Sequence, residues 1–380
     1  MSDMQHSDTQ QRPTSGLRGL TRRRAVRIVA AAAGLPLMIA AVRATAPAGR
    51  LFDWQGEVLG AFAELSLWHT DEAAARRAIR QVEGEIARYE RIFGLARADS
   101  EITRLNAAGA LTGPSPELRG LMEESRCFSV LSAGAFDISV QPLWRLYEAH
   151  FWSRSAVQDD VLARARDVAR DLVDYRAIDI GAARIAFARP GMAVTLNSLA
   201  QGFVTDACAD LLRNEGFATA FVDLGEVRAL GRHPDGRPWR VGIRNPQAAG
   251  LMQANPGRAD SAQTDSVQAG LVQAGPVRSG VAQTLDLEDT AMAVSGGYGT
   301  TFEPTGRFHH IFDPHTGESA HALLDATVVG PRATVANGLS TALCVTGEER
   351  AAALIAGCPG YRAILTRPDG TTVGFGATAA

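Results

Sequence analysis

The order of strand-like and helical segments is the feature that most restricts how this chain can fold. Apolar and polar residues alternate from 62 to 68, which is the period of a β-strand, and β-rich stretches follow at 220–224 and 239–243. Strand-like segments therefore come in runs with helices between them, without a sustained strand–helix alternation and without a glycine-rich nucleotide fingerprint. This order predicts an α+β fold in which mixed or antiparallel sheets are flanked by helices.

Helices are expected where apolar residues recur at helical spacing and where capping residues precede such a segment. An Ala- and Arg-rich segment begins at Glu72, and Asp99 or Ser100 can cap a further helix that runs through Leu105. Gly216 follows the helix expected in the centre of the chain. The other expected helices span 72–92, 117–131, 199–212 and, as the last one, 335–345.

The segment 247–283 differs in composition from the rest of the chain. It consists mostly of Gln, Ala, Gly, Ser and Asp, and the sequence Val-Gln-Ala-Gly occurs in it twice in close succession. Such a composition cannot bury enough apolar surface to offset the entropy lost on ordering. We therefore expect a disordered surface insertion in a loop of a single domain, 47–380, with order resuming at Leu285.

The first 46 residues have the three-part order of an export signal. Arginines are concentrated at 22–27, an apolar stretch follows from 28 to 42, and Ala44-Thr45-Ala46 ends the segment. The apolar stretch is shorter than the roughly 20 residues that a membrane-spanning helix needs. Adjacent arginines before an Ala-rich core favour the twin-arginine route, with cleavage and a periplasmic protein, and a Sec signal or an uncleaved anchor is the alternative.

Charge and cysteine spacing exclude two classes of function. The formal net charge is only -3, so no basic surplus indicates nucleic acid as a partner. The four cysteines, Cys127, Cys208, Cys344 and Cys358, are far apart and form no C-x-x-C pair, which argues against a zinc site. Whether two of them form a disulfide is left open by the sequence.

Four separated segments, taken in order, carry a shared pattern. They are SAGAFDISV at 132–140; SLAQGFVTD at 198–206, followed by VDLG at 222–225; AVSGGY at 293–298 with HHIFDPHTG at 309–317; and ANGLSTA at 336–342. The first is similar to GAFDPTV, the second to GIAKGYAVD and the fourth to ADALATA, which are motifs of the ApbE family of FAD-dependent protein FMN transferases. The chain resembles this family from about residue 59 to 374, interrupted by the insertion.

This resemblance implies an ApbE-like, T-fold-related architecture and a specific reaction. In that reaction FMN is moved from FAD to a Ser or Thr hydroxyl of a client flavoprotein, and AMP is released. The client implied is exported or membrane-associated with a periplasmic acceptor, and the enzyme itself is a monomer or homodimer. Attack of a hydroxyl on a pyrophosphate requires charge neutralisation, which Mg²⁺ with oxygen ligands supplies.

The resemblance also implies the metal ligands. The family's ligands include the Asp and Thr of the fourth motif, which correspond to Asn337 and Thr341, and a backbone oxygen near Ala200. Asn337 and Thr341 are four positions apart, so they share one face if the segment is helical. The alternative interpretation is that Asn337-Gly338 forms a plain turn.

Residues of the first three motifs are expected to contact FAD. The resemblance implies that Asp223 and Gly225 line the flavin or adenine pocket, with Asp137 and Gln201 as further contacts. Ser295-Gly296-Gly297 is small enough for backbone N–H groups to approach a phosphate. The alternatives are a simple bend between strands at 295–297 and a turn or cap role for Asp137.

His310 is the candidate for proton transfer and for contact with FAD. An imidazole titrates near neutrality, and the family places a functionally important His before Asp-Pro-x-Thr-Gly. The alternative is a buried histidine with a structural role only. The segment Asp313-Pro314-His315-Thr316-Gly317 itself has the composition of a turn.

Three positions depart from the family's pattern. Asn337 offers a carbonyl oxygen but no negative charge, so the magnesium affinity is expected to fall and Asn337→Asp to lower the magnesium requirement. Glu226 replaces a common second Gly and is expected to narrow the pocket. Gln201 stands where most members carry Lys, which favours the NosX-like branch, associated with flavinylating a membrane component of nitrous oxide respiration.

Two other functions remain open at this point. The missing charge at Asn337 is compatible with a non-catalytic FAD-binding carrier or assembly factor. Replacement of the client hydroxyl by water would instead make the protein a FAD pyrophosphatase that releases FMN and AMP.

Overall fold

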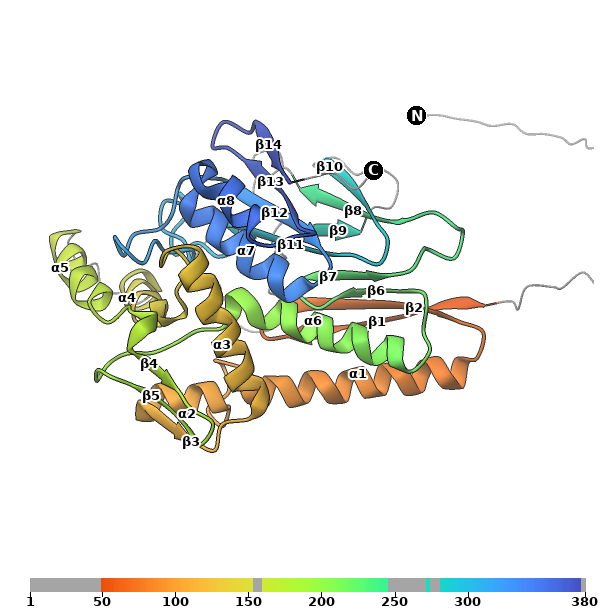
Figure 1. The fold of residues 1–380 in the computed structure, drawn as a ribbon, viewed down its shortest axis with the longest axis horizontal. Helices are drawn as coiled ribbons and strands as arrows, with labels where there is room; N and C mark the ends of the chain where they lie inside the picture. The colour runs from red at the N-terminus through yellow and green to blue at the C-terminus, as the bar shows by residue number, and fades with distance from the viewer. Residues whose placement is uncertain (1–48, 153–158, 245–270, 274–280, 377–380) are drawn as a thin grey trace, which may run out of the picture. The chain divides into compact units, whose positions relative to one another are not determined.

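The computed structural model describes residues 49–152, 159–244, 271–273 and 281–376, which belong to one compact unit, Pro47–Ala380 (Figure 1). The export signal expected at 1–46 and most of the insertion expected at 247–283 lie outside the described residues. In the described part, no helix combines the length and apolar character needed to cross a membrane.

The main sheet is antiparallel throughout its eight strands, which confirms the predicted α+β class. Its spatial order joins the first two strands of the chain to the last four through β6 and β7. In that order the strands are β1 (Arg50–Val58), β2 (Ala61–His69), β6 (Ala220–Asp223), β7 (Val227–Leu230), β11 (Ala291–Gly296), β12 (Asp325–Gly330), β13 (Arg362–Thr366) and β14 (Thr372–Phe375).

Two three-stranded antiparallel sheets complete the strands of the described part. One consists of β10 (Val281–Leu287), β8 (Trp239–Arg244) and β9 (Leu271–Gln273), and the other of β3 (Ala110–Thr112), β5 (Arg184–Phe187) and β4 (Ile178–Ile180). Strand β9 and the start of β10 lie within the segment 247–283, in which the sequence predicts a disordered insertion. Both segments pair with β8 through backbone groups, and such pairing does not require an apolar composition.

The helices expected from periodicity are present, with ends that differ by a few residues. They are α1 (Glu72–Phe93), α2 (Glu101–Ala108), α3 (Pro116–Leu131), α6 (Asn197–Asn214) and α7 (Ala333–Thr346). Ser100 rather than Asp99 caps α2, because its side chain accepts from the amide of Thr103. Gly338 lies inside α7, so the alternative of a turn at Asn337-Gly338 is wrong.

Other helical segments were not expected from the sequence. They are α4 (Gln141–Trp152), α5 (Asp159–Arg170), α8 (Ala351–Ala356) and the short 3₁₀ turns η1 (Ile138–Val140), η2 (Tyr175–Ala177), η4 (Gly297–Gly299) and η5 (Glu348–Arg350). Helix α8 follows α7, so the expectation that the helix at 335–345 is the last one is wrong. Six residues are too few for a periodic pattern to be recognised.

The main sheet has a core on each of its faces. On one face, Ala220 and Val222 of β6 belong to the same buried cluster as residues of α1, α6 and α7. On the other, Phe221 of β6 packs in a second cluster with Trp239 and Val241 of β8. The strict alternation along β6 follows from the two-residue period of a strand and puts the sheet between a helical layer and the small sheet of β8 (Figure 1).

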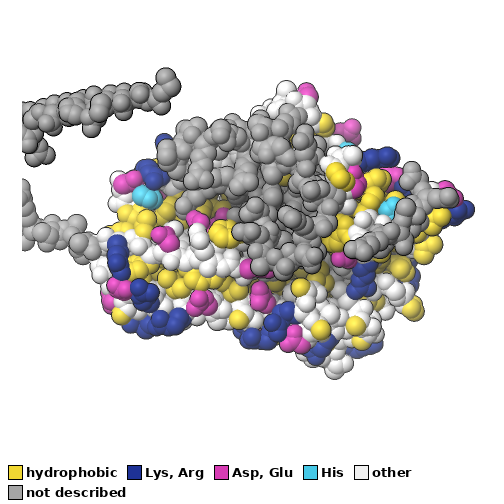
Figure 2. All heavy atoms as spheres, turned by 180° about the vertical axis from the view of Figure 1, so that it is seen from behind, with side chains coloured by type: hydrophobic (Ala, Val, Ile, Leu, Met, Phe, Trp, Pro, Cys, Tyr) yellow, Lys and Arg dark blue, Asp and Glu magenta, His cyan; other side chains and the backbone are white. Residues whose placement is uncertain are grey.

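The surface turned away from the view of Figure 1 carries mixed charge. Where that face is drawn in colour, basic and acidic side chains are interspersed (Figure 2). Elsewhere, exposed ion pairs such as Arg76–Glu72 and Arg50–Glu72 also compensate charge locally.

Helices α6 and α7 approach each other closely because glycines stand at the contact. A Cβ on Gly202 of α6 would lie 2.5 Å from the carbonyl oxygen of Ala333 at the start of α7. A Cβ on Gly338 of α7 would lie 2.9 Å from Cδ2 of Leu199. Both glycines therefore serve helix packing, and Gly202 faces backbone that cannot move aside as a side chain can.

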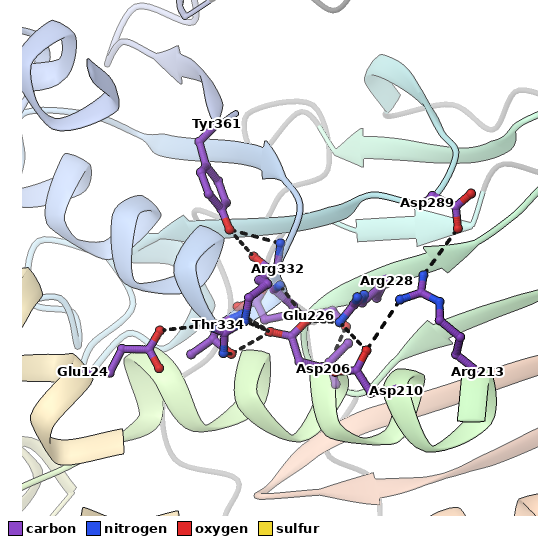
Figure 3. Close-up of polar contacts among 12 residues, drawn as sticks. Glu124, Asp206, Asp210, Arg213, Glu226, Arg228, Asp289, Arg332, Thr334 and Tyr361 are labelled. Atoms are coloured by element: carbon purple, nitrogen blue, oxygen red, sulfur yellow. Dashed lines mark hydrogen bonds and ion pairs between the residues drawn. The ribbon is translucent and has the colours of Figure 1, made fainter. Parts of the chain in front are cut away.

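A buried carboxylate on α6 fixes the start of α7 (Figure 3). One oxygen of Asp206, Oδ1, accepts hydrogen bonds from the amide of Ala333 at 2.9 Å and from Arg228 of β7 at 2.8 Å. The other, Oδ2, accepts from the amide of Thr334 at 2.9 Å and from its hydroxyl at 2.7 Å. Because the N-cap residue Arg332 makes no side-chain capping bond, Asp206 supplies the cap of α7 from a neighbouring helix.

Replacing Gly202 with Ala should lower the free energy of unfolding by about 1–3 kcal/mol, because the new methyl group has no space against the backbone of α7. Gly84 is the matched control: it lies exposed in α1, and a Cβ there would contact nothing. Gly84→Ala should stabilise by roughly 0.5–1 kcal/mol. Urea unfolding of both variants tests the packing, and equal effects would contradict it.

Replacing Asp206 with Asn should cost about 3–5 kcal/mol of stability, because Arg228 would lose its buried charged partner and an NH₂ group cannot accept the bonds of Thr334. Asp210 also pairs with Arg228, at 3.2 Å, but its side chain is 56% exposed. Asp210→Asn should therefore cost less than about 1 kcal/mol. Similar losses in the two variants, measured by urea unfolding, would show that the Asp206 network is not the stabilising one.

Candidate active site

A cavity of about 470 Å³ brings together residues from all four motif segments. Such a volume is typical of pockets that bind small molecules and cofactors. It lies where the start of α6, the turn between β6 and β7, the end of β11 and one face of α7 meet. The residues expected to bind FAD or metal that line it are Asp137, Gln201, Gly225, Ser295, Gly296, His310, Asn337 and Thr341.

Three other expected site residues do not line this cavity. Asp223 is buried at the end of β6, and its carboxylate accepts from the amide of Gly225 at 3.4 Å. Ala200 is buried within α6, next to Gln201. Gly297 lies against the ring of His309, since a Cβ there would come within 2.7 Å of that ring.

The end of β11 is joined to α7 by hydroxyl groups. Ser295 Oγ lies 3.2 Å from Thr341 Oγ1 and 2.8 Å from Ser340 Oγ. The thiol of Cys344 donates to the carbonyl oxygen of Ser295 at 3.1 Å. These contacts hold the Ser295-Gly296 segment against the face of α7 that carries Asn337 and Thr341.

Gln201 is placed by the conformation of Gly225. Gly225 has φ +102°, a region that residues with a Cβ rarely adopt, and a Cβ there would lie 2.7 Å from the side-chain carbon Cδ of Gln201. The glycine therefore allows the Gln201 side chain to cross the turn between β6 and β7. Glu226 follows Gly225 in that turn and also lines the cavity.

Glu226 and Asn337 form a buried pair. The amide of Asn337 donates to Glu226 Oε1 at 2.5 Å. Burial raises the pKa of Glu226 well above its usual range, and the charge of Asp223 raises it further. Among the described residues, Glu226 Oε2 and Asn337 Oδ1 are buried without a hydrogen-bond partner. Buried acceptors without a partner are rare in proteins and call for an explanation.

His310 lines the cavity as a neutral imidazole. Its Nδ1 lies 3.1 Å from the carbonyl oxygen of Thr300, which can only accept, so Nδ1 carries the hydrogen and Nε2 keeps its lone pair. Burial lowers the pKa of His310 to about 4, against the opposing effect of this hydrogen bond. His310 is therefore an available proton acceptor at neutral pH. Its ring also contacts Trp144 edge-on, with the centroids 6.2 Å apart.

The carboxylate of Asp137 accepts hydrogen bonds from other residues of the protein. Its Oδ1 accepts from the amide of Ser139 at 2.8 Å and from the hydroxyl at 2.6 Å, and its Oδ2 accepts from the amide of Tyr175 at 2.9 Å. Burial raises its pKa, although these hydrogen bonds act in the opposite direction. Asp137 is the N-cap of η1, so the cap role considered from the sequence is confirmed.

The segment after His310 is a tight turn, as its composition predicted. The amide of Gly317 donates to the carbonyl of Asp313 at 2.8 Å, and Gly317 has φ +73°. The Asp313 carboxylate accepts from the amide of His315 at 2.9 Å. Within the residues that the structure describes, no three His, Cys, Asp or Glu side chains are grouped so as to hold a metal ion.

Several cavity residues were missed by the sequence argument. Trp144 comes from α4, which was not expected, and Asn197 and Thr195 precede the second motif. Leu59 and Gly60 form the turn between β1 and β2, with φ 51° and 84°. The Leu59-Gly60 turn could have been inferred from its glycine, whereas a single Trp outside a motif carries no signal of its position in a cavity.

Known proteins are similar to this chain over most of its length. The family model described as ApbE family matches residues 59–365. A FAD:protein FMN transferase of Treponema pallidum (strain Nichols) is 30% identical over 333 residues, which cover 82% of this chain and 83% of that protein. The crystal structure of Pseudomonas stutzeri flavinyl transferase ApbE, apo form, is similar with TM-score 0.66 and 25% identity, covering 86% of this chain and 95% of that one.

A second solved structure, the flavin transferase ApbE from Vibrio cholerae, has TM-score 0.68 at 23% identity and covers 86% of this chain and 97% of its own. At that identity the likeness shows the fold. Together with the match of the family model over most of the described residues, these similarities show that the chain belongs to the ApbE family.

Proposed function

We propose that this protein transfers FMN from FAD to a Ser or Thr hydroxyl of a client protein and releases AMP. The observation that carries the proposal is a single cavity that holds a neutral imidazole, a Ser-Gly segment and unpartnered oxygen atoms together. Support comes from family membership and from relatives named FAD:protein FMN transferase, such as the one from Treponema pallidum.

The cavity fits a divalent cation such as Mg²⁺. Glu226 Oε2 and Asn337 Oδ1 are oxygen atoms without a hydrogen-bond partner among the described residues. Thr341, which lies on α7 with Asn337, adds a hydroxyl group to the cavity lining. Hard cations prefer such oxygen donors, and Mg²⁺ is commonly held by one or two carboxylates together with substrate phosphates. When bound, the cation supplies neutralisation of the negative charge on the pyrophosphate.

His310 accepts the proton of the attacking hydroxyl in this proposal. The hydroxyl oxygen forms a bond to the phosphorus on the FMN side of FAD, and the bridging P–O bond breaks, so AMP leaves with the bridging oxygen. The hydroxyl proton passes to Nε2 of His310, since Nδ1 already carries a hydrogen. Ser295 and Gly296 line the cavity, where backbone N–H groups of this segment can bind the phosphate.

The proposal extends to where the protein acts. An export signal of the twin-arginine type at residues 1–46 would deliver it to the periplasm, where a membrane-associated client would present its acceptor. Gln201, in place of the usual Lys, supports a role in the maturation of nitrous oxide respiration, the function associated with the NosX-like branch. The protein itself would act as a monomer or homodimer.

The purified protein with FAD, Mg²⁺ and a client domain should yield a client that carries covalent flavin, seen as fluorescence on a denaturing gel. A client whose acceptor hydroxyl is removed is the control and should stay unlabelled. FAD binding without labelling of a proven client would instead indicate a carrier. A pyrophosphatase would release FMN and AMP in the absence of a client, and it would leave the client unlabelled when the client is added.

His310→Asn should slow transfer by roughly two to four orders of magnitude and leave FAD binding nearly intact, because Asn can still donate to Thr300 but cannot accept the proton. The neighbouring His309 is the matched control, since it is buried, does not line the cavity and accepts from the amide of Ile311 at 3.3 Å. His309→Asn should lower the free energy of unfolding and leave the rate constant of FMN transfer by the folded enzyme unchanged. Parallel loss of FAD binding in His310→Asn would support a structural role.

A further inference from the structure

Two of the three positions at which this chain departs from its family's motifs, Asn337 and Glu226, contact each other. Asn337 stands where the fourth motif has Asp, and Glu226 stands where the segment after β6 commonly has Gly. They are 111 residues apart in sequence, yet the Asn337 amide donates to Glu226 Oε1 at 2.5 Å. The carboxylate missing from one position is thus present on the residue that it touches.

The contact also determines which atoms remain available. Because Nδ2 of Asn337 is engaged by Oε1 of Glu226, Oδ1 of Asn337 and Oε2 of Glu226 are the free oxygens of the pair. Both are buried without a hydrogen-bond partner in the described part of the chain, although both residues line the cavity. A divalent cation is the ligand that would satisfy both oxygens at once with Glu226 ionised, since an amide oxygen and a carboxylate oxygen can only accept hydrogen bonds.

The backbone of Glu226 is held in place independently of Asn337. Thr205 of α6 donates its hydroxyl to the carbonyl oxygen of Glu226 at 3.1 Å. Two residues further on, Arg228 is fixed by Asp206, the neighbour of Thr205 on α6. The carboxyl is therefore presented from a rigid turn, as a preorganised metal ligand must be.

We propose that Glu226 supplies the negative charge that position 337 lacks, and that Glu226 and Asn337 together bind one divalent cation. This inference rests on the proposed function, in which that cation neutralises the pyrophosphate. It replaces two expectations from the sequence: Glu226 is a ligand rather than an obstruction in the pocket, and Asn337 alone does not make the site weak. The site has one carboxylate and one amide, with the carboxylate on the turn rather than on the helix.

Exchange of the two side-chain types tests this assignment. Glu226→Gln removes the charge, whereas Glu226→Gln combined with Asn337→Asp returns it to the helix and keeps a hydrogen-bonded amide–carboxylate pair. Mn²⁺ is the probe, and its binding is measured from the electron paramagnetic resonance signal of the free ion with FAD present. FAD binding without metal, followed by flavin fluorescence, is measured for every variant.

Glu226→Gln should weaken Mn²⁺ binding on the order of ten- to hundredfold, and the exchange variant should recover most of that affinity. Unchanged Mn²⁺ affinity in Glu226→Gln would overturn the inference, as would a loss that the exchange variant does not reverse while its FAD binding is intact. Should Glu226→Gln be unstable, Glu226→Gly with Asn337→Asp rebuilds the family's motif, and failure of this variant to bind Mn²⁺ better than Glu226→Gly alone overturns the inference equally.

These outcomes separate the inference from the proposed function. If the parent protein binds neither FAD nor Mn²⁺ in the presence of FAD, the proposed function fails and so does the inference built on it. If the parent binds both and labels a client, but Glu226→Gln binds Mn²⁺ equally well, only the assignment of Glu226 fails.

Discussion

The positions of the elements around the cavity depend on the hydrogen bonds that the buried carboxylate of Asp206 accepts. Asp206 belongs to α6, and its carboxylate accepts hydrogen bonds from Arg228 of β7 and from Ala333 and Thr334 of α7 at 2.7–2.9 Å (Figure 3). A buried charge in this position is stable only because every partner is in place. Since it caps α7, it also sets the position of the helix that carries Asn337 and Thr341. The Gly202 contact sets how closely the same two helices approach.

The same part of α6 positions the opposite wall of the cavity. Thr205 holds the carbonyl of Glu226, and Asp206 holds the side chain of Arg228. Both contacts are to the turn and strand that follow Gly225, whose left-handed conformation admits Gln201. One helical turn of α6 thus fixes a face of α7 and the turn between β6 and β7, and the cavity lies where these two meet.

Burial favours the neutral forms of the titratable groups in this cavity. It lowers the pKa of His310 to about 4 and raises that of Glu226. A neutral imidazole can accept a proton, and a buried carboxyl ionises when a cation compensates its charge. The protonation states of these two groups therefore depend on the charges that a bound molecule brings into the cavity.

The sequence by itself determined the α+β class, the positions of α1, α3, α6 and α7, and the motif residues that line the cavity, because periodicity and short motifs are local properties. Only the tertiary structure showed that Gly338 lies within a helix, that 271–273 and 281–283 pair with β8, and that Trp144 lines the cavity. It also placed Glu226 against Asn337. That contact joins residues 111 positions apart, and no local pattern can encode it, because it follows from how α6 holds α7 and the turn after β6 together.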